Sequence, residues 1–161
     1  MFYSNARIYG ADFRFHHGAF EVKDGVFGAV LPENVPDDAV DLQGATVIPG
    51  MIDVHSHGNS GADFSDGDYE GLKKMARFYA SCGVTSFAPA SMTLPYEVLA
   101  KAFATAVQLK EEKPEGCAAL RGIQMEGPYF SYKKRGAQNP DYLKDPDFEG
   151  FQKLYDGCGG L

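Results

Sequence analysis

From Gly50 onward, short apolar runs alternate with amphipathic helical stretches, and this rhythm limits the folds open to the chain. Extended runs are expected at residues 51–55, 84–88 and 118–126, with helices between them that begin after Asp66 or Asp68 and near Pro95. Each strand-helix unit is about thirty residues long, enough for a helix to return the chain to a parallel strand. The sequence therefore predicts an α/β fold in which the order β-α-β-α-β forms a parallel sheet.

The first 49 residues have a different pattern. Short runs rich in aromatic and branched residues are separated by turn residues, which is typical of β-strands in a small sheet. Lys23-Asp24-Gly25 predicts a hairpin turn, 26–31 its return strand, and 32–38 a polar loop. We therefore expect two domains, a β segment at 1–49 that forms part of a small sandwich, and an α/β part at 50–161.

The first strand of the α/β part ends in a pair of histidines. Side chains alternate faces along a strand, so His55 and His57 lie on one face with Asp53 below them. Two imidazoles at a strand end favour a divalent metal site, with Asp53 as a ligand or as an acceptor behind the ligands. The plainer alternative is a strand that ends in two polar residues.

Glu126 ends the third expected strand, directly before Gly127-Pro128. In parallel sheets the carboxyl ends of the strands share one edge, where ligands bind. Taken alone, Glu126 is equally well explained as a surface residue before a turn. Together with the histidine pair at the same edge, it favours a shared metal site.

Composition excludes some partners. A formal net charge of −7 argues against nucleic acid and anionic membranes as partners. No apolar run approaches the length of about 20 residues that a membrane-spanning helix needs. The three cysteines lack a C-x-x-C spacing and are interpreted as reduced thiols of a cytoplasmic protein. His16 and His17 are expected in an exposed turn, and Lys133-Lys134-Arg135 on a solvated loop.

Residues 50–58, Gly-Met-Ile-Asp-Val-His-Ser-His-Gly, resemble the opening of the amidohydrolase superfamily, which comprises metal-dependent hydrolases on a (β/α)8 barrel. Three further stretches, at 58–63, 124–130 and 133–140, resemble its N-acetylglucosamine-6-phosphate deacetylase branch. The resemblance covers nearly the whole chain. It implies hydrolysis of the acetamide of an amino-sugar phosphate, which yields acetate and glucosamine-6-phosphate.

The resemblance also implies roles for individual residues. Glu126 would bind the metal, together with His55 and His57 in members that keep both histidines. Ala137 and Gln138 would bind the substrate; some members carry histidine at the second of these positions. The metal would be one or two ions of Zn, Fe, Mn or Co, the catalytic aspartate is expected beyond this chain, and the full-length enzyme is expected to be a homodimer.

A complete (β/α)8 barrel needs about 200 residues or more. We therefore expect an incomplete TIM-type barrel of about three βα units after the β segment, and a fragment without activity of its own. Two alternatives stay open: another amidohydrolase, such as a deaminase or cyclic amidase, and a non-catalytic metal-binding module.

Overall fold

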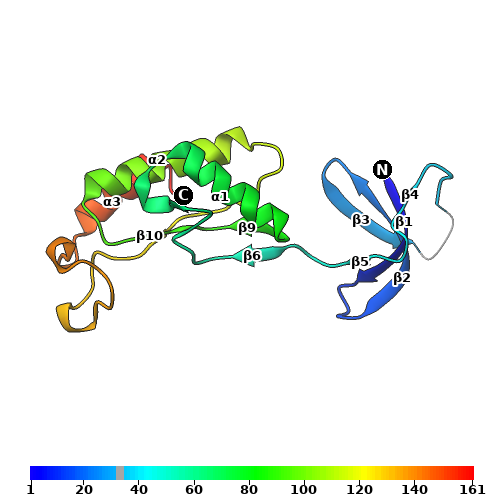
Figure 1. Ribbon diagram of the computed structural model, residues 1–161, viewed down its shortest axis with the longest axis horizontal. Coiled ribbons are helices and arrows are strands. Elements are labelled where there is room, and N and C mark those ends of the chain that lie inside the picture. Colours follow the sequence, from blue (N-terminus) through cyan, green and yellow to red (C-terminus); the bar gives the residue numbers. More distant parts are fainter. Residues whose placement is uncertain (32–34) are drawn as a thin grey trace. The chain divides into compact units, whose positions relative to one another are not determined.

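A computed structural model describes residues 1–31 and 35–161 of the chain. The first three residues of the loop predicted at 32–38 therefore lie outside the described residues. The chain forms two compact units, Met1–Pro49 and Gly50–Leu161 (Figure 1). Among the helices of the described residues, none combines the length and the hydropathy needed to cross a bilayer.

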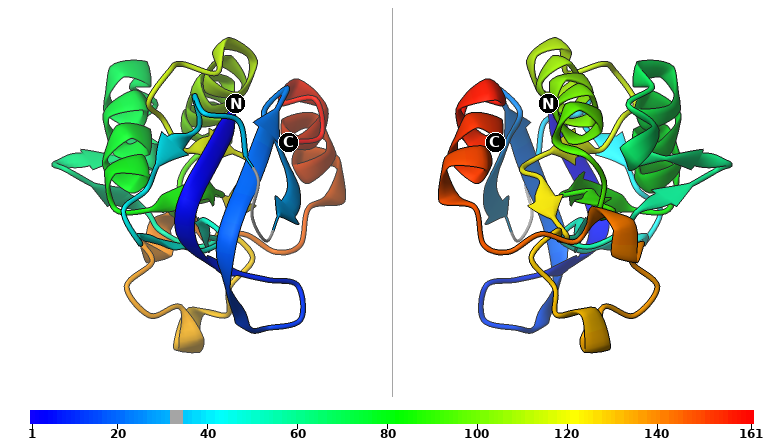
Figure 2. Two further views of the ribbon diagram at one scale, coloured as in Figure 1. Left: turned by 90° about the vertical axis from the view of Figure 1, so that its right-hand side faces the viewer. Right: turned by 90° about the vertical axis from the view of Figure 1, so that its left-hand side faces the viewer.

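The first unit is a five-stranded sheet with the order β3-β2-β1-β4, in which β5 also pairs with β1. Its strands are β1 (Phe2–Tyr9), β2 (Phe15–Lys23), β3 (Val26–Leu31), β4 (Val40–Asp41) and β5 (Thr46–Val47). The strands β1, β2 and β3 pair antiparallel, and the long strands β1 and β2 run beside each other in Figure 2. The β-rich pattern predicted for this segment is confirmed.

The predicted hairpin turn joins β2 to β3. Asp24 and Gly25 are its two central residues, and both have positive φ, at 52° and 74°. This conformation suits the right-handed twist of the flanking strands and favours aspartate or asparagine followed by glycine. Packing then fixes which faces are covered, because Ala6, Ile8 and Phe20 form the core of this unit.

The second unit contains parallel strands with crossover helices. Its main elements are β6 (Met51–Asp53), α1 (Tyr69–Ser81), β9 (Val84–Phe87), β10 (Ala90–Ser91), α2 (Tyr96–Glu112), β11 (Ala119–Leu120), β12 (Gln124–Met125) and α3 (Phe148–Gly157). Short elements fill the loops, namely β7 (Gly58–Asn59), β8 (Ala62–Asp63) and the 3-10 turns η1 (Phe64–Asp66), η2 (Tyr132–Lys134) and η3 (Pro140–Tyr142). The parallel order β11-β9-β6 confirms the predicted βα units.

The strand predicted at 118–126 is divided into two. Its first part, β11, pairs with β9, and its second part, β12, pairs with β10. The neighbouring strand is interrupted at Pro89, which has no N–H to donate to a ladder. The backbone N–H groups of Arg121 and Gln124 still donate hydrogen bonds to the carbonyl oxygens of Phe87 and Pro89. The two neighbouring segments therefore stay side by side across the gap.

The helices of the second unit lie on one side of its strands (Figure 1). Figure 2 shows them side by side, with α2 between α1 and α3. Asp68 caps α1 through its carboxylate, as predicted, and Gly83 follows that helix with φ of 81°. The core between helices and strands includes Leu72, Met75, Phe87, Leu99 and Phe103.

Helix α3 starts after Asp147, which caps its first turn. Its apolar face is only partly packed. Leu154 is buried, but Phe148, Phe151 and Tyr155 are 74%, 37% and 46% exposed.

Candidate metal centre

Backbone hydrogen bonds beyond the ladders bring three strand ends together. Asp53, the last residue of β6, and Ser56, three residues further on, accept hydrogen bonds through their carbonyl oxygens from the N–H groups of Ala88 and Ala90, at 2.8 and 2.9 Å. Ala90 in turn starts β10, which runs parallel to β12, and Glu126 follows directly after β12. The segment with both histidines therefore runs beside β10, and Glu126 ends the strand next to it.

Three side chains converge at this edge. Oε2 of Glu126 lies 3.2 Å from Nε2 of His55 and 3.1 Å from Nε2 of His57. One ligand atom from each residue lies within 4.8 Å of the others, and among the described residues this is the one group of three or more histidine, cysteine or acidic side chains so arranged. The sequence predicted all three residues, and the structure brings them together.

His57 is held in one tautomer. Its Nδ1 lies 3.0 Å from the carbonyl oxygen of Ala90. A carbonyl oxygen can only accept, so Nδ1 carries the proton, and in the neutral ring Nε2 keeps its lone pair. That lone pair is on the nitrogen nearest to Glu126, which is the arrangement of a metal-ligating histidine whose other nitrogen bonds a carbonyl.

Glu126 has one bound and one unbound oxygen. Its Oε1 accepts a hydrogen bond from Nε2 of Gln138 at 3.1 Å. Its Oε2 is buried and has no hydrogen-bond partner, although two imidazole nitrogens lie close to it. Since a buried carboxylate oxygen without a partner is costly, a cation among these three atoms would relieve the cost. The residues present therefore fit a divalent metal with nitrogen and oxygen ligands.

Asp53 is not among the converging ligand atoms, but it accepts a hydrogen bond from one of the ligand residues. Its Oδ1 accepts from the backbone N–H of His55 at 3.0 Å, so it bonds the backbone that carries the imidazole and not the ring itself. The acidic loop that follows acts locally. Asp63 caps η1 in a reciprocal capping box with Asp66.

The remaining histidines lie in the first unit. His16 and His17 are exposed as expected, but they belong to strand β2 and not to a turn. Nε2 of His16 lies 2.9 Å from Oδ1 of Asp12, and this hydrogen bond lowers the pKa of Asp12.

Gln138 is buried, whereas Ala137 is exposed. Oε1 of Gln138 accepts from the backbone N–H of Thr93 at 2.8 Å, and its Nε2 donates to Glu126. Thr93 is itself buried, and its hydroxyl donates to the carbonyl oxygen of Glu126 at 3.4 Å. Sequence reasoning missed Thr93, because a backbone N–H can be offered by almost any residue type.

The loop that carries Gln138 is closed at its base. Lys144 donates its backbone N–H to the carbonyl oxygen of Pro128 at 3.1 Å, and the Tyr129 hydroxyl donates to the carbonyl oxygen of Asp147 at 3.0 Å. The hydroxyl of Tyr96, from the start of α2, lies 2.8 Å from that of Tyr129. The two ends of the loop are therefore held together independently of its tip.

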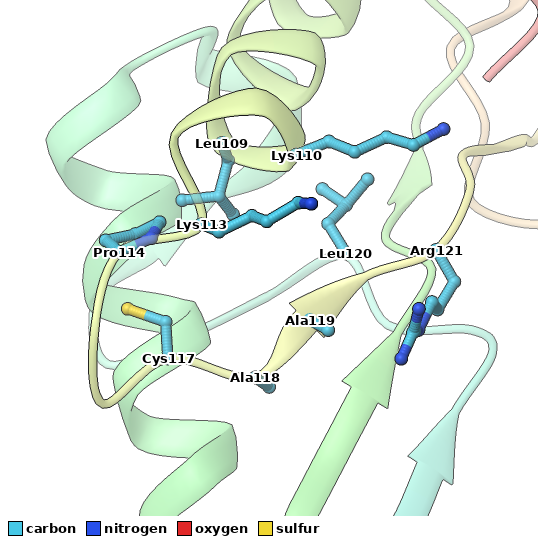
Figure 3. A pocket seen from close by; sticks show the side chains of 9 residues that line it. All are labelled: Leu109, Lys110, Lys113, Pro114, Cys117, Ala118, Ala119, Leu120 and Arg121. Carbon is cyan, nitrogen blue, oxygen red and sulfur yellow. The ribbon is translucent and has the colours of Figure 1, made fainter. Parts of the chain in front are cut away.

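The basic run 133–135 makes local contacts. Lys133 and Lys134 are exposed, and Arg135 donates to the carbonyl oxygen of Tyr132 while its guanidinium lies over the Tyr132 ring. A separate cavity of about 590 Å³ lies between the end of α2 and β11 (Figure 3). It is lined by Leu109, Lys110, Lys113, Pro114, Cys117, Ala118, Ala119, Leu120 and Arg121. It includes none of the candidate ligands.

The three cysteines, Cys82, Cys117 and Cys158, are all free thiols, as the sequence predicted.

Comparisons with known proteins agree with the geometry. No protein-family model matches the chain. N-acetylglucosamine-6-phosphate deacetylase of Bacillus subtilis is 32% identical over 151 residues, which are 90% of this chain and 38% of that protein. The crystal structure of the Pasteurella multocida deacetylase superposes with a TM-score of 0.85 at 29% identity, over 100% of this chain and 43% of that one.

A third relative shows the fold. The D267A mutant of the Mycobacterium smegmatis deacetylase, solved in complex with N-acetyl-D-glucosamine-6-phosphate, superposes with a TM-score of 0.81 at 24% identity, over 99% of this chain and 41% of that one. The chain thus spans about two fifths of the length of these relatives. It is homologous to the N-terminal portion of the N-acetylglucosamine-6-phosphate deacetylases.

Proposed function

We propose that this chain forms the N-terminal part of a metal-dependent deacetylase that acts on N-acetylglucosamine-6-phosphate in the cytoplasm. In this proposal, Gly50–Leu161 supplies the first βα units of a (β/α)8 barrel, and Met1–Pro49 contributes to a small β-sandwich. The observation that carries the proposal is the buried, unpartnered Oε2 of Glu126 beside two imidazole nitrogens. The names of the homologues supply the substrate.

His55, His57 and Glu126 would hold the divalent ion at the carboxyl end of the parallel strands. A divalent ion held there would supply a water of lowered pKa and would polarise the acetamide carbonyl. The chain's own residues prepare this site. Ala90 orients His57, and Gln138 occupies the second oxygen of Glu126, so that one atom of each ligand faces the common point.

Substrate contacts are proposed for the loop that follows β12. Exposed Ala137 offers its backbone groups, and Gln138 lies directly beside the metal ligand Glu126. The position of Gln138 beside Glu126 supports a role of this loop in recognising an acetamide next to the metal. The deacetylase reaction conserves atoms by adding water across the amide bond, which releases acetate and leaves glucosamine-6-phosphate.

The metal site is tested by titrating the apo chain with Co²⁺, whose visible absorption reports the ligands. We expect saturable binding by the wild type and at least about tenfold weaker binding by Glu126→Gln. Glu149→Gln, an exposed change on α3, is the matched control and keeps wild-type affinity. Equal binding by Glu126→Gln and the wild type would remove Glu126 from the site.

The reaction is tested with a chimera in which this chain is continued by the remaining strands of the Pasteurella multocida deacetylase. The chimera is expected to release acetate from N-acetylglucosamine-6-phosphate, and its Glu126→Gln variant is expected to lose that activity. The 161-residue chain alone is expected to release none. Hydrolysis of a cyclic amide by the chimera, without acetate release, would favour a different amidohydrolase, and metal binding without either reaction would favour a non-catalytic module.

A further inference from the structure

We propose that Gln138 is a positioning residue that fixes the orientation of the Glu126 carboxylate, and that the backbone of Thr93 fixes Gln138 in turn. The inference rests on the proposed metal centre and adds to it. A glutamine in a substrate-binding loop would be expected to keep its amide available for hydroxyl groups. Here the amide oxygen and the amide nitrogen are both already engaged by the protein.

The direction of the amide follows from its partners. The backbone N–H of Thr93 can only donate, so the atom 2.8 Å away from it must be the amide oxygen of Gln138. The amide nitrogen therefore points to Oε1 of Glu126, 3.1 Å away. A reversed amide would place two donors against each other at Thr93 and two acceptors against each other at Glu126.

The bond from Gln138 settles which carboxylate oxygen faces the histidines. Because Oε1 is occupied by a donor, Oε2 is left to face His55 and His57. Gln138 is 6% exposed and Thr93 is 2% exposed, so water competes little for either bond. Gln138 does not itself reach the metal position, but its hydrogen bond orients the Glu126 carboxylate that would bind the metal.

Thr93 holds Glu126 in a second way. Its hydroxyl donates to the carbonyl oxygen of Glu126. Gly127 follows with φ of 84°, and a Cβ at this position would overlap Oγ1 of Thr93. The close approach of the two loops therefore depends on glycine at 127. Thr93, two residues after the end of β10, thus restrains the backbone of Glu126 directly and its carboxylate through Gln138.

The test measures Co²⁺ affinity and the visible spectrum of the Co²⁺-loaded 161-residue chain in three variants. Gln138→Met keeps the length but loses both hydrogen bonds, and Gln138→Asn keeps the amide but is too short to reach both partners. Both are expected to weaken binding by about 10- to 100-fold and to change the spectrum. Gln138→His can accept at one ring nitrogen and donate at the other, so it is expected to keep affinity within about threefold of the wild type.

Gln124→Met is the matched control, because Gln124 is exposed and two residues before Glu126. Circular dichroism of each apo variant separates loss of folding from loss of affinity. If Gln138→Met does not fold, the weaker binding and altered spectrum of folded Gln138→Asn, restored in Gln138→His, still support the proposal. Wild-type affinity and spectrum in folded Gln138→Asn or Gln138→Met would overturn it. Absence of Co²⁺ binding in the wild type itself would instead overturn the metal centre.

Discussion

His57 is bonded through Nδ1 to the carbonyl oxygen of Ala90, 3.0 Å away, so its side chain adds a second link to the backbone hydrogen bond that already joins the segment after β6 to strand β10. Replacing His57 with alanine removes a proposed ligand and this link. We expect Zn²⁺ affinity of the chain, measured by competition with a chromogenic chelator, to fall at least about tenfold. His17→Ala, an exposed histidine of β2, is the control and is expected to bind Zn²⁺ as the wild type does. Equal losses in the two variants would mean that Zn²⁺ binds the histidines without a specific site.

Asp147 is expected to make the free energy of unfolding of the second unit depend on pH in the acidic range. The hydrogen bond from the N–H of Gly150 holds the pKa of Asp147 below its usual value, while burial opposes this. A carboxyl with a lowered folded pKa adds stability above its unfolded pKa, and this contribution is lost as the pH falls through the folded pKa. We therefore expect the wild type to lose stability below about pH 4 more steeply than Asp147→Asn.

Urea unfolding at several pH values between about 2.5 and 7 measures this effect, using helical circular dichroism. Asp145→Asn is the control, because Asp145 is exposed and does not cap the helix. Parallel pH profiles for the wild type and Asp147→Asn would show that Asp147 does not contribute. The hydroxyl of Tyr96, whose pKa is raised mainly by burial and then by its bond to Tyr129, stays protonated throughout this range.

Helix α3 offers two glycines with opposite expected responses. A Cβ at Gly150 would overlap the ring of Tyr96 and the carboxylate of Asp147, whereas a Cβ at Gly157 would meet nothing within 4 Å. Gly150→Ala is expected to reduce the free energy of unfolding by about 1–3 kcal/mol through overpacking. Gly157→Ala is expected to raise it by about 0.5–1 kcal/mol, because alanine favours the helix. Thermal unfolding of both variants tests the packing of α3 on the start of α2, and stabilisation by Gly150→Ala would contradict it.

The three-stranded sheet of the second unit has two outer strands, β6 and β11. Ile52, within the outer strand β6, and Val54, directly after it, are 68% and 64% exposed. Unpaired strand edges with apolar side chains favour association between chains. We expect light scattering to show self-association of the 161-residue chain at micromolar concentration, and less of it in the Ile52→Lys, Val54→Lys double variant. A monomer at all concentrations would contradict this prediction.

The sequence predicted the parts of the site that depend on residue type and strand direction. His55, His57 and Glu126 were expected at one edge because parallel strands align their carboxyl ends, and their side chains do converge. Whether they bind a metal stays a prediction. The hairpin at Asp24-Gly25 was predicted for a similar reason, since the turn demands particular residues.

Other features depended on contacts that no local pattern encodes. Thr93 acts on Gln138 through its backbone N–H, a group that every residue except proline has, so the residue type does not reveal this contact. The division of the third strand into β11 and β12 follows from Pro89 in its neighbour, and so from a residue about thirty positions away. Asp53 accepts from the backbone N–H of His55 and not from its ring, a choice that residue type and strand alternation do not specify.

The closed base of the Gln138 loop has a consequence for how this site can change. Residues 129–144 form an Ω-loop, because the bond from Lys144 to Pro128 and that from Tyr129 to Asp147 join its two ends. Its tip, which includes Lys133, Lys134 and Ala137, is exposed, whereas Gln138 is anchored inside. Substitutions or insertions at the tip can therefore alter what approaches the candidate centre without moving the glutamine that orients Glu126. The loop separates the part of the site that can diversify from the part that must stay fixed.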